Sequence, residues 1–215
     1  MSQSTGSVST LRLTPIFIGM CVLVGLIIGV LTIVLQKLLP DSVIQLANSG
    51  AVWSIVAFVI GRKVGSWRIA AIGGFVALVG EVAGYYLVAY FADLMDISTG
   101  TLAVIGLWLV IALVAGPLFG WAGYVSVHGQ GLRQKIGIAS LGGVFIGEGL
   151  YLMSIQPKPN TGLLWLVIAI VVTLLLTWKS SERMRIWLIT IALGLLFFGG
   201  EQLLVLLDQL RAQSF

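Results

Sequence analysis

Residues 69–91 read IAAIGGFVALVGEVAGYYLVAYF, a run of 23 residues in which Glu81 is the only charged side chain. At about 1.5 Å of rise per residue, an α-helix of this length can cross the ~30 Å hydrocarbon core of a bilayer. An ionised carboxylate at the centre of such a helix costs roughly 2.5–3.5 kcal/mol on insertion-based scales. We therefore expect Glu81 to be neutral, to share a cation or to line water.

The pairing of glycine with glutamate recurs in two more apolar stretches, as Gly147-Glu148 and Gly200-Glu201, again without an adjacent lysine or arginine. Helix rise counted from the preceding basic turn predicts all three carboxylates at similar depth, in the outer half of the membrane. Each glutamate could have its own hydrogen-bond partner, or all three could line one polar cavity. We favour the common cavity because intramembrane acids are commonly functional.

Composition predicts an integral membrane protein, since 59% of the 215 residues are hydrophobic and 9% are charged. The expected fold is an all-α, polytopic transmembrane helix bundle, with one transmembrane domain over 13–207 between a polar cytoplasmic N-terminus (1–12) and a short outer tail (208–215). The second helix has the least apolar start, because it contains Gln45, Asn48 and Ser49. The seven predicted helices are 13–35, 44–61, 69–91, 101–125, 135–154, 162–178 and 186–207.

Basic residues gather on one side of this seven-helix arrangement. By the positive-inside rule that side is cytoplasmic, which predicts an inner (plasma) membrane protein of bacterial type with its N-terminus inside and its C-terminus outside. Membrane topology then explains the excess of basic over acidic residues, and no nucleic-acid partner is expected. Nine of the twelve basic residues lie there: Arg12, Arg62, Lys63, Arg68, Arg133, Lys135, Lys179, Arg183 and Arg185.

The glutamates belong to a repeated pattern. Predicted helices two and three, four and five, and six and seven each join a tryptophan-bearing helix to a glycine-glutamate helix, so we expect one helix plus three helix-hairpin repeats, with a site between repeats. The tryptophans of the three repeats are Trp53, Trp108 and Trp165. They are expected either in the interfacial belt or turned inward as an aromatic-acidic cage for an organic cation. Trp67, Trp121, Trp178 and Trp187 are predicted cytoplasmic-side anchors. The candidate ligand-binding or proton-coupling residues are Glu81, Glu148, Glu201, Tyr85, Tyr151, Trp53, Trp108 and Trp165.

Glycines predict close packing and one irregular helix. Gly25-x-x-x-Gly29 forms a small face on the first helix, typical of a helix contact. The stretch Gly116-Pro117-Leu118-Phe119-Gly120 predicts a bend or a break, because proline removes a backbone donor.

The stretches Leu46-Ala-Asn48-Ser49-Gly50-Ala-Val-Trp53, Gly84-Tyr85-Tyr86 and Gly116–Gly120 resemble an uncharacterised bacterial multi-pass membrane family, a domain of unknown function, over about 13–207. The chain is also similar, by analogy, to the substrate-binding subunits of energy-coupling-factor vitamin transporters. Those proteins are small and apolar, lack an ATPase and typically have six helices. This looser resemblance implies a site that opens outward.

The leading functional hypothesis is binding or transport of a small, cationic solute in the outer half of the bilayer, coupled to protons through the carboxylates. The alternative is a non-catalytic subunit or scaffold that docks a partner protein or a second copy. An intramembrane enzyme comes third, because no nucleotide-binding loop, metal-ligand spacing or nucleophile motif occurs and the only histidine, His128, lies in a basic-side loop. No cofactor or metal is expected.

Overall fold

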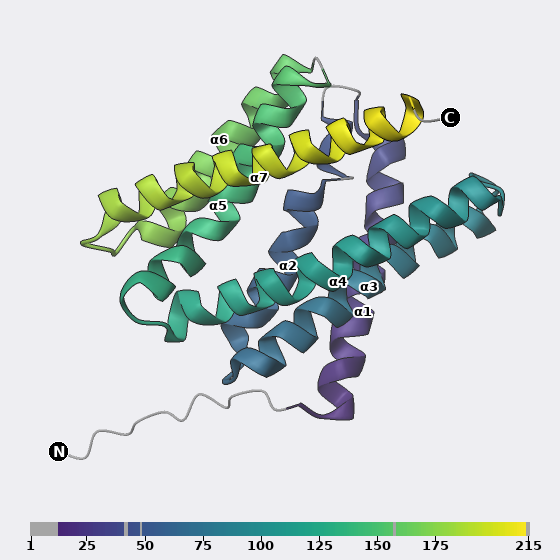
Figure 1. Cartoon of the computed structure of the whole chain (residues 1–215). Helices are drawn as coiled ribbons and strands as arrows, with labels where there is room; N and C mark the ends of the chain where they lie inside the picture. The colour runs from purple at the N-terminus through teal and green to yellow at the C-terminus, as the bar shows by residue number, and fades with distance from the viewer. Residues whose placement is uncertain (1–12, 41–42, 48, 157, 214–215) are drawn as a thin grey trace.

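The computed structural model describes residues 13–40, 43–47, 49–156 and 158–213, with side chains except at 204 and 207–213. The predicted N-terminal segment 1–12 lies outside these ranges, as does Asn48. Seven long helices confirm the predicted all-α bundle (Figure 1). The elements are α1 (Pro15–Leu38), the 3-10 turn η1 (Ile44–Leu46), α2 (Gly50–Lys63), α3 (Trp67–Phe91), α4 (Thr99–His128), α5 (Gly131–Ser154), α6 (Pro159–Thr177) and α7 (Arg183–Gln213).

Several helices begin at residues that cap them. Thr14 accepts a hydrogen bond from the Phe17 amide at 3.1 Å, and Ser49 accepts one from the Val52 amide at 3.2 Å. Such side chains satisfy donors that have no partner within the helix. Ser49 therefore separates the η1 turn from α2, where the sequence predicted one helix over 44–61. At its other end the chain differs as well, since α7 continues to Gln213 rather than ending at 207.

α4 is continuous from Thr99 to His128 and contains Pro117 in its interior. Of the two predicted alternatives, a bend or a break, the break is thereby excluded. Gly116 and Gly120 flank the proline on the side where α4 lies against the backbone of α3 at Gly74 and Ala70, and a side chain at either glycine would meet that backbone. These glycines serve close helix packing.

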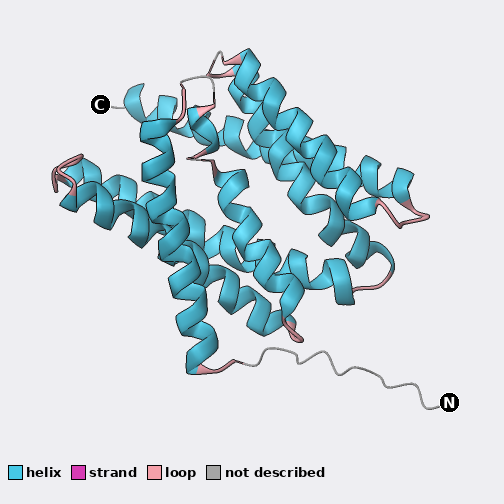
Figure 2. Ribbon diagram, turned by 180° about the vertical axis from the view of Figure 1, so that it is seen from behind, coloured by secondary structure: helices cyan, strands magenta, loops and turns pink. Residues whose placement is uncertain are grey.

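Two helices organise the packing. α3 packs against α1, α4 and α2, while α5 packs against α6 and α7, and α4 joins the two halves through α5 (Figures 1 and 2). Within the predicted hairpin of α6 and α7 the two helices touch only slightly, so the closest packing crosses the predicted repeat units. Gly25 and Gly29 let α1 approach α3 so closely that a Cβ at either would meet the carbonyl oxygens of Ala77 and Glu81.

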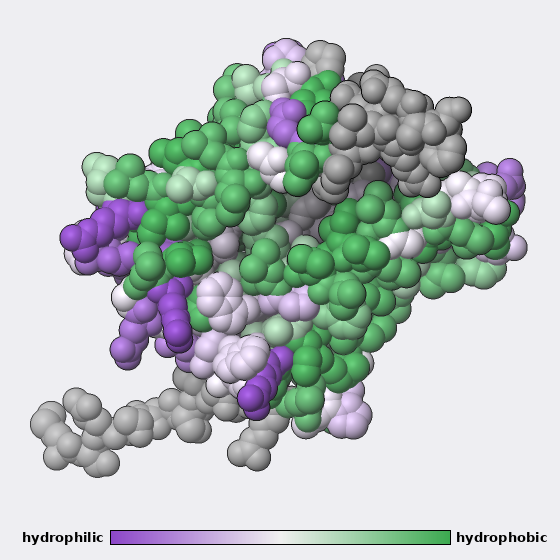
Figure 3. Space-filling model, in the orientation of Figure 1, coloured by the Kyte–Doolittle hydropathy of each residue, from purple (hydrophilic) through white to green (hydrophobic). Residues whose placement is uncertain are grey.

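The surface is that of a membrane-embedded protein. All seven candidate spans are long and apolar enough to cross a bilayer, including the stretch Ile44–Lys63. Figure 3 shows hydrophobic residues over much of the visible face, with hydrophilic residues gathered near the turns that join α2 to α3, α4 to α5 and α6 to α7. These are the turns in which the sequence places most of its basic residues, and we call this side the basic end.

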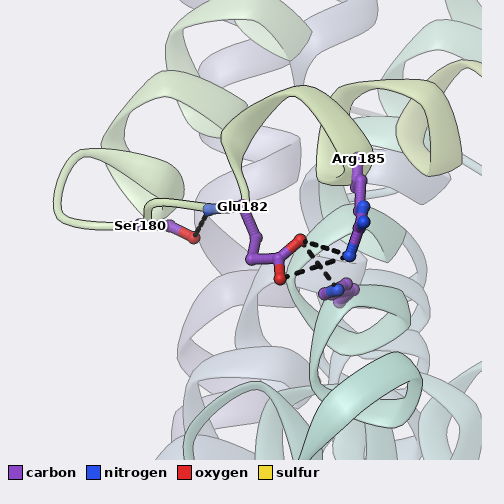
Figure 4. A network of polar contacts seen from close by, with 4 residues as sticks. Ser180, Glu182 and Arg185 are labelled. Carbon is purple, nitrogen blue, oxygen red and sulfur yellow. Dashed lines mark hydrogen bonds and ion pairs between the residues drawn. The ribbon is translucent and has the colours of Figure 1, made fainter.

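An ion-pair cluster ties two helices together at the basic end (Figure 4). Glu182 pairs with Lys135 at the start of α5 and with Arg185 at the start of α7, both at 3.0 Å. The hydrogen bond from Lys135 is the main cause that lowers the pKa of the Glu182 carboxyl below its usual 4.5. The cluster is partly exposed, so it contributes little to stability by itself.

Candidate functional site

The eight predicted site residues fall into two groups of four. The first comprises Trp53 on α2, Glu81 and Tyr85 on α3, and Trp108 on α4. The Trp53 ring contacts both other aromatic rings of this group: its centroid lies 5.5 Å from that of Trp108 and 6.3 Å from that of Tyr85. We call these four residues the aromatic-acidic cluster, to which Glu81 belongs by its place one turn before Tyr85 on α3.

Glu81 is the least satisfied polar group in this cluster. Its side chain is 0% exposed, and neither carboxyl oxygen has a hydrogen-bond partner among the described residues. The indole N–H of Trp53 is likewise buried without a partner. A buried polar group without a partner is costly whether it is charged or neutral, so the cluster retains unused hydrogen-bonding capacity in the interior.

A cavity of about 410 Å³ adjoins the cluster, between the ends of α1, α3 and α4 that lie opposite the basic end. Tyr85 lines it, and its hydroxyl donates to Oε1 of Gln36 at 3.3 Å. Glu81 precedes Tyr85 by one turn, so the two occupy the same face of α3. Four further residues line this cavity and were not among the predicted site residues: Gln36, Lys37, Tyr86 and Thr101. The polar pair Gln36-Lys37 at the end of an otherwise apolar helix was the available signal.

The second group comprises Glu148, Tyr151, Trp165 and Glu201, on α5, α6 and α7. Glu148 has partners of its own: the Ser49 hydroxyl donates to its Oε2 at 2.9 Å and the Ala51 amide at 2.8 Å. The carboxylate thus lies at the N-terminus of α2, where the helix dipole favours negative charge. Glu148 therefore matches the alternative in which each glutamate has its own hydrogen-bond partner.

Trp165 joins the hydrogen bonds around Ser49, whereas Tyr151 has its partner outside this group. The Trp165 indole donates to the Ser49 hydroxyl at 3.3 Å, and the Gln156 amide donates to the Tyr151 hydroxyl at 3.4 Å. Trp53 and Trp165 are 5% and 0% exposed, so the belt alternative is wrong for both. Trp67 and Trp178, by contrast, are exposed near the basic end, where anchors were predicted.

Glu201 is an electrostatic neighbour of Glu148, and its Oε2 is buried without a partner among the described residues. A cavity of about 460 Å³ lies nearby, lined by Ser154 of α5 and by Gln202 and Val205 of α7. The structure therefore brings two of the three glutamates together and gives Glu81 different surroundings. Within the described chain, no three His, Cys, Asp or Glu side chains converge as a metal site would require.

These features define a membrane-embedded bundle of seven helices with buried carboxyl groups and cavities beside them. The chain belongs to a family of unknown function, DUF6518, which it matches over residues 9–209. The predicted resemblance to an uncharacterised family is thereby confirmed. No curated protein and no solved structure matches the chain.

Proposed function

We propose that this protein binds or transports a small solute that carries a cationic group, and that the solute reaches the aromatic-acidic cluster from the cavity beside Tyr85. The observation that carries the proposal is Glu81, which is fully buried and has no hydrogen-bond partner for either oxygen in the described chain. A cationic group of a solute would supply the missing partner.

The aromatic rings of the cluster suit an organic cation. The ring faces of Trp53, Trp108 and Tyr85 attract positive charge and exclude water, and such attraction strengthens on desolvation. A cavity of about 410 Å³ lies within the range of small-molecule sites. Lys37 also lines this cavity, on the last turn of α1. Its ammonium would repel a simple cation but would attract an anionic group, so we favour a zwitterionic solute with its cationic end toward Glu81.

Orientation is part of the proposal. The basic turns favour the basic end as the cytoplasmic side of an inner (plasma) membrane. The cavity would then open to the outside, as the looser resemblance to transporter subunits implies. Proton coupling through Glu81 remains a prediction of the sequence.

Binding to the purified full-length chain tests the proposal. A panel of zwitterions, organic cations and anions is screened for stabilisation of the wild type, because a ligand that binds the folded state raises its apparent melting temperature. We expect a zwitterion or cation to stabilise the wild type and to lose this effect in Glu81→Gln. Glu201→Gln is the matched control, since it makes the same change in another intramembrane helix. An effect that survives Glu81→Gln would contradict the proposal.

The alternative hypothesis of a docking subunit has less support. It relied on glycine faces, and Gly25 and Gly29 already lie against α3. A partner that co-purifies from native membranes, together with an isolated chain that no solute stabilises, would favour that alternative. Turnover that a single glutamate substitution abolishes without unfolding the chain would favour the third hypothesis, an intramembrane enzyme.

A further inference from the structure

A groove between α1 and α2 lies outside the aromatic-acidic cluster. Both helices pack on α3, yet they barely touch each other. The groove has a volume of about 330 Å³, and its lining is apolar apart from Lys63, the one charged lining residue in the described chain. Met20 and Val59 line it and are exposed, so the groove opens toward lipid.

Lys63 lies at one end of this groove. It is the last residue of α2 and belongs to the basic end of the bundle. Its side chain is exposed, and the ion pairs of the described residues involve Lys135, Arg185 and Glu182 but not Lys63. Glu182, the acid of the basic-end turns, is therefore already paired, and the ammonium of Lys63 is free to bind an anion.

We propose that this groove binds an anionic phospholipid of the leaflet at the basic end, with one acyl chain between α1 and α2 and the phosphate on Lys63. The lining of α2 runs from Ile55 to Lys63, about 12 Å of helix, along which an acyl chain can lie. A lysine at a helix end reaches the headgroup level by extending its ammonium outward. The apolar part of the groove can hold the acyl chain, and the unpaired ammonium of Lys63 can bind the phosphate. The apolar lining offers no hydrogen-bond partner to a polar solute.

The site is independent of the proposed solute site. The cavity beside Tyr85 lies at the opposite ends of the helices and shares no lining residue with the groove. A substitution at Lys63 therefore tests lipid binding without touching Glu81.

Photo-cross-linking tests the proposal on the purified full-length chain. Phosphatidylglycerol with a photoactivatable acyl chain is bound, cross-linked and mapped by peptide mass spectrometry, with unlabelled phosphatidylglycerol or phosphatidylcholine as competitor. We expect the cross-links to concentrate in residues 17–24 and 55–63. Unlabelled phosphatidylglycerol should compete for the site better than phosphatidylcholine. Lys63→Gln should weaken that competition about fivefold, the effect of one lysine near an anionic leaflet, and Lys63→Arg should restore it.

Lys179→Gln is the matched control, because Lys179 is a basic residue of the α6–α7 turn that does not line the groove. It should leave the competition unchanged. Cross-links spread equally over the exposed faces of α4 and α6, or equal effects of Lys63→Gln and Lys179→Gln, would show bulk lipid only and overturn the proposal. Protection of the groove by a co-purifying protein would overturn it as well.

Discussion

Replacing Glu148 tests how the N-terminus of α2 is held. Its Oε2 accepts two hydrogen bonds, from the Ser49 hydroxyl and the Ala51 amide, and both donor residues are buried. Glu148→Leu would leave both donors without a partner. At about 1–3 kcal/mol for each buried unsatisfied group, we expect a loss of about 4 kcal/mol in the free energy of unfolding.

Glu148→Gln separates charge from hydrogen bonding, because the amide oxygen can still accept both bonds. A hydrogen bond to a charged group contributes about 1 kcal/mol more than a neutral one, so the expected loss is about 2 kcal/mol for the two bonds. Glu201→Gln, whose buried oxygen has no donor to lose in the described structure, should change stability by less than about 1 kcal/mol.

Unfolding of the purified chain by SDS in mixed micelles, followed by tryptophan fluorescence, provides the measurement. The expected order of stability is wild type and Glu201→Gln, then Glu148→Gln, then Glu148→Leu. Wild-type stability in Glu148→Gln with a large loss in Glu148→Leu would mean that the carboxyl is neutral. Wild-type stability in both Glu148 variants would contradict this prediction, since the hydrogen bonds from Ser49 and Ala51 would then contribute nothing.

Further substitutions test three other parts of the fold. Gly29→Ala should destabilise the chain by about 1–3 kcal/mol, because its Cβ would meet the α3 backbone at Glu81 and Tyr85. The Cβ of Gly19→Ala would meet no atom within 4 Å, so this variant should be neutral or slightly stabilising in the same SDS unfolding assay. Asp93 has a φ of 52° in the turn after α3, so Asp93→Gly should raise stability by up to about 1 kcal/mol in SDS unfolding and Asp93→Val should lower it. The folded-state pKa of Glu182 is lowered, so the small stabilisation from its ion pairs is fully present above pH 4.5 and is lost as pH falls through the lowered value. Melting curves of wild type and Glu182→Gln should therefore differ slightly at about pH 7 and converge in acid.

The helices were predictable because span length is a direct demand of the bilayer. Apolar runs of 17–25 residues have few alternatives when every backbone group must be paired internally. The predicted helix 69–91 and the observed α3, Trp67–Phe91, share their last residue. The sequence could not decide between a bend and a break in α4, because it shows what Pro117 removes but not how α3 packs against the helix around it.

The candidate site was predictable as a set of residues but not as an arrangement. Glu148 and Ser49 are 99 positions apart, and nothing in either stretch shows that they meet. The polar Ser49 weakened the prediction of the second helix. Its hydroxyl nevertheless caps α2 and donates a hydrogen bond to Glu148. Depth counted from basic turns gives a height in the membrane but no rotation about the helix axis, so it could not separate Glu81 from the other two glutamates.

The near absence of contact between α1 and α2 has a consequence for biosynthesis. As the chain leaves the ribosome, α1 and α2 enter the bilayer with almost no surface to share, and only the arrival of α3 gives both a partner. The packing of α1 into the bundle therefore waits for α3, where Gly25 and Gly29 meet the turn that carries Glu81. Until then α1 remains available to insertion factors, and a chain stalled before α3 would present two unassembled helices to membrane quality control.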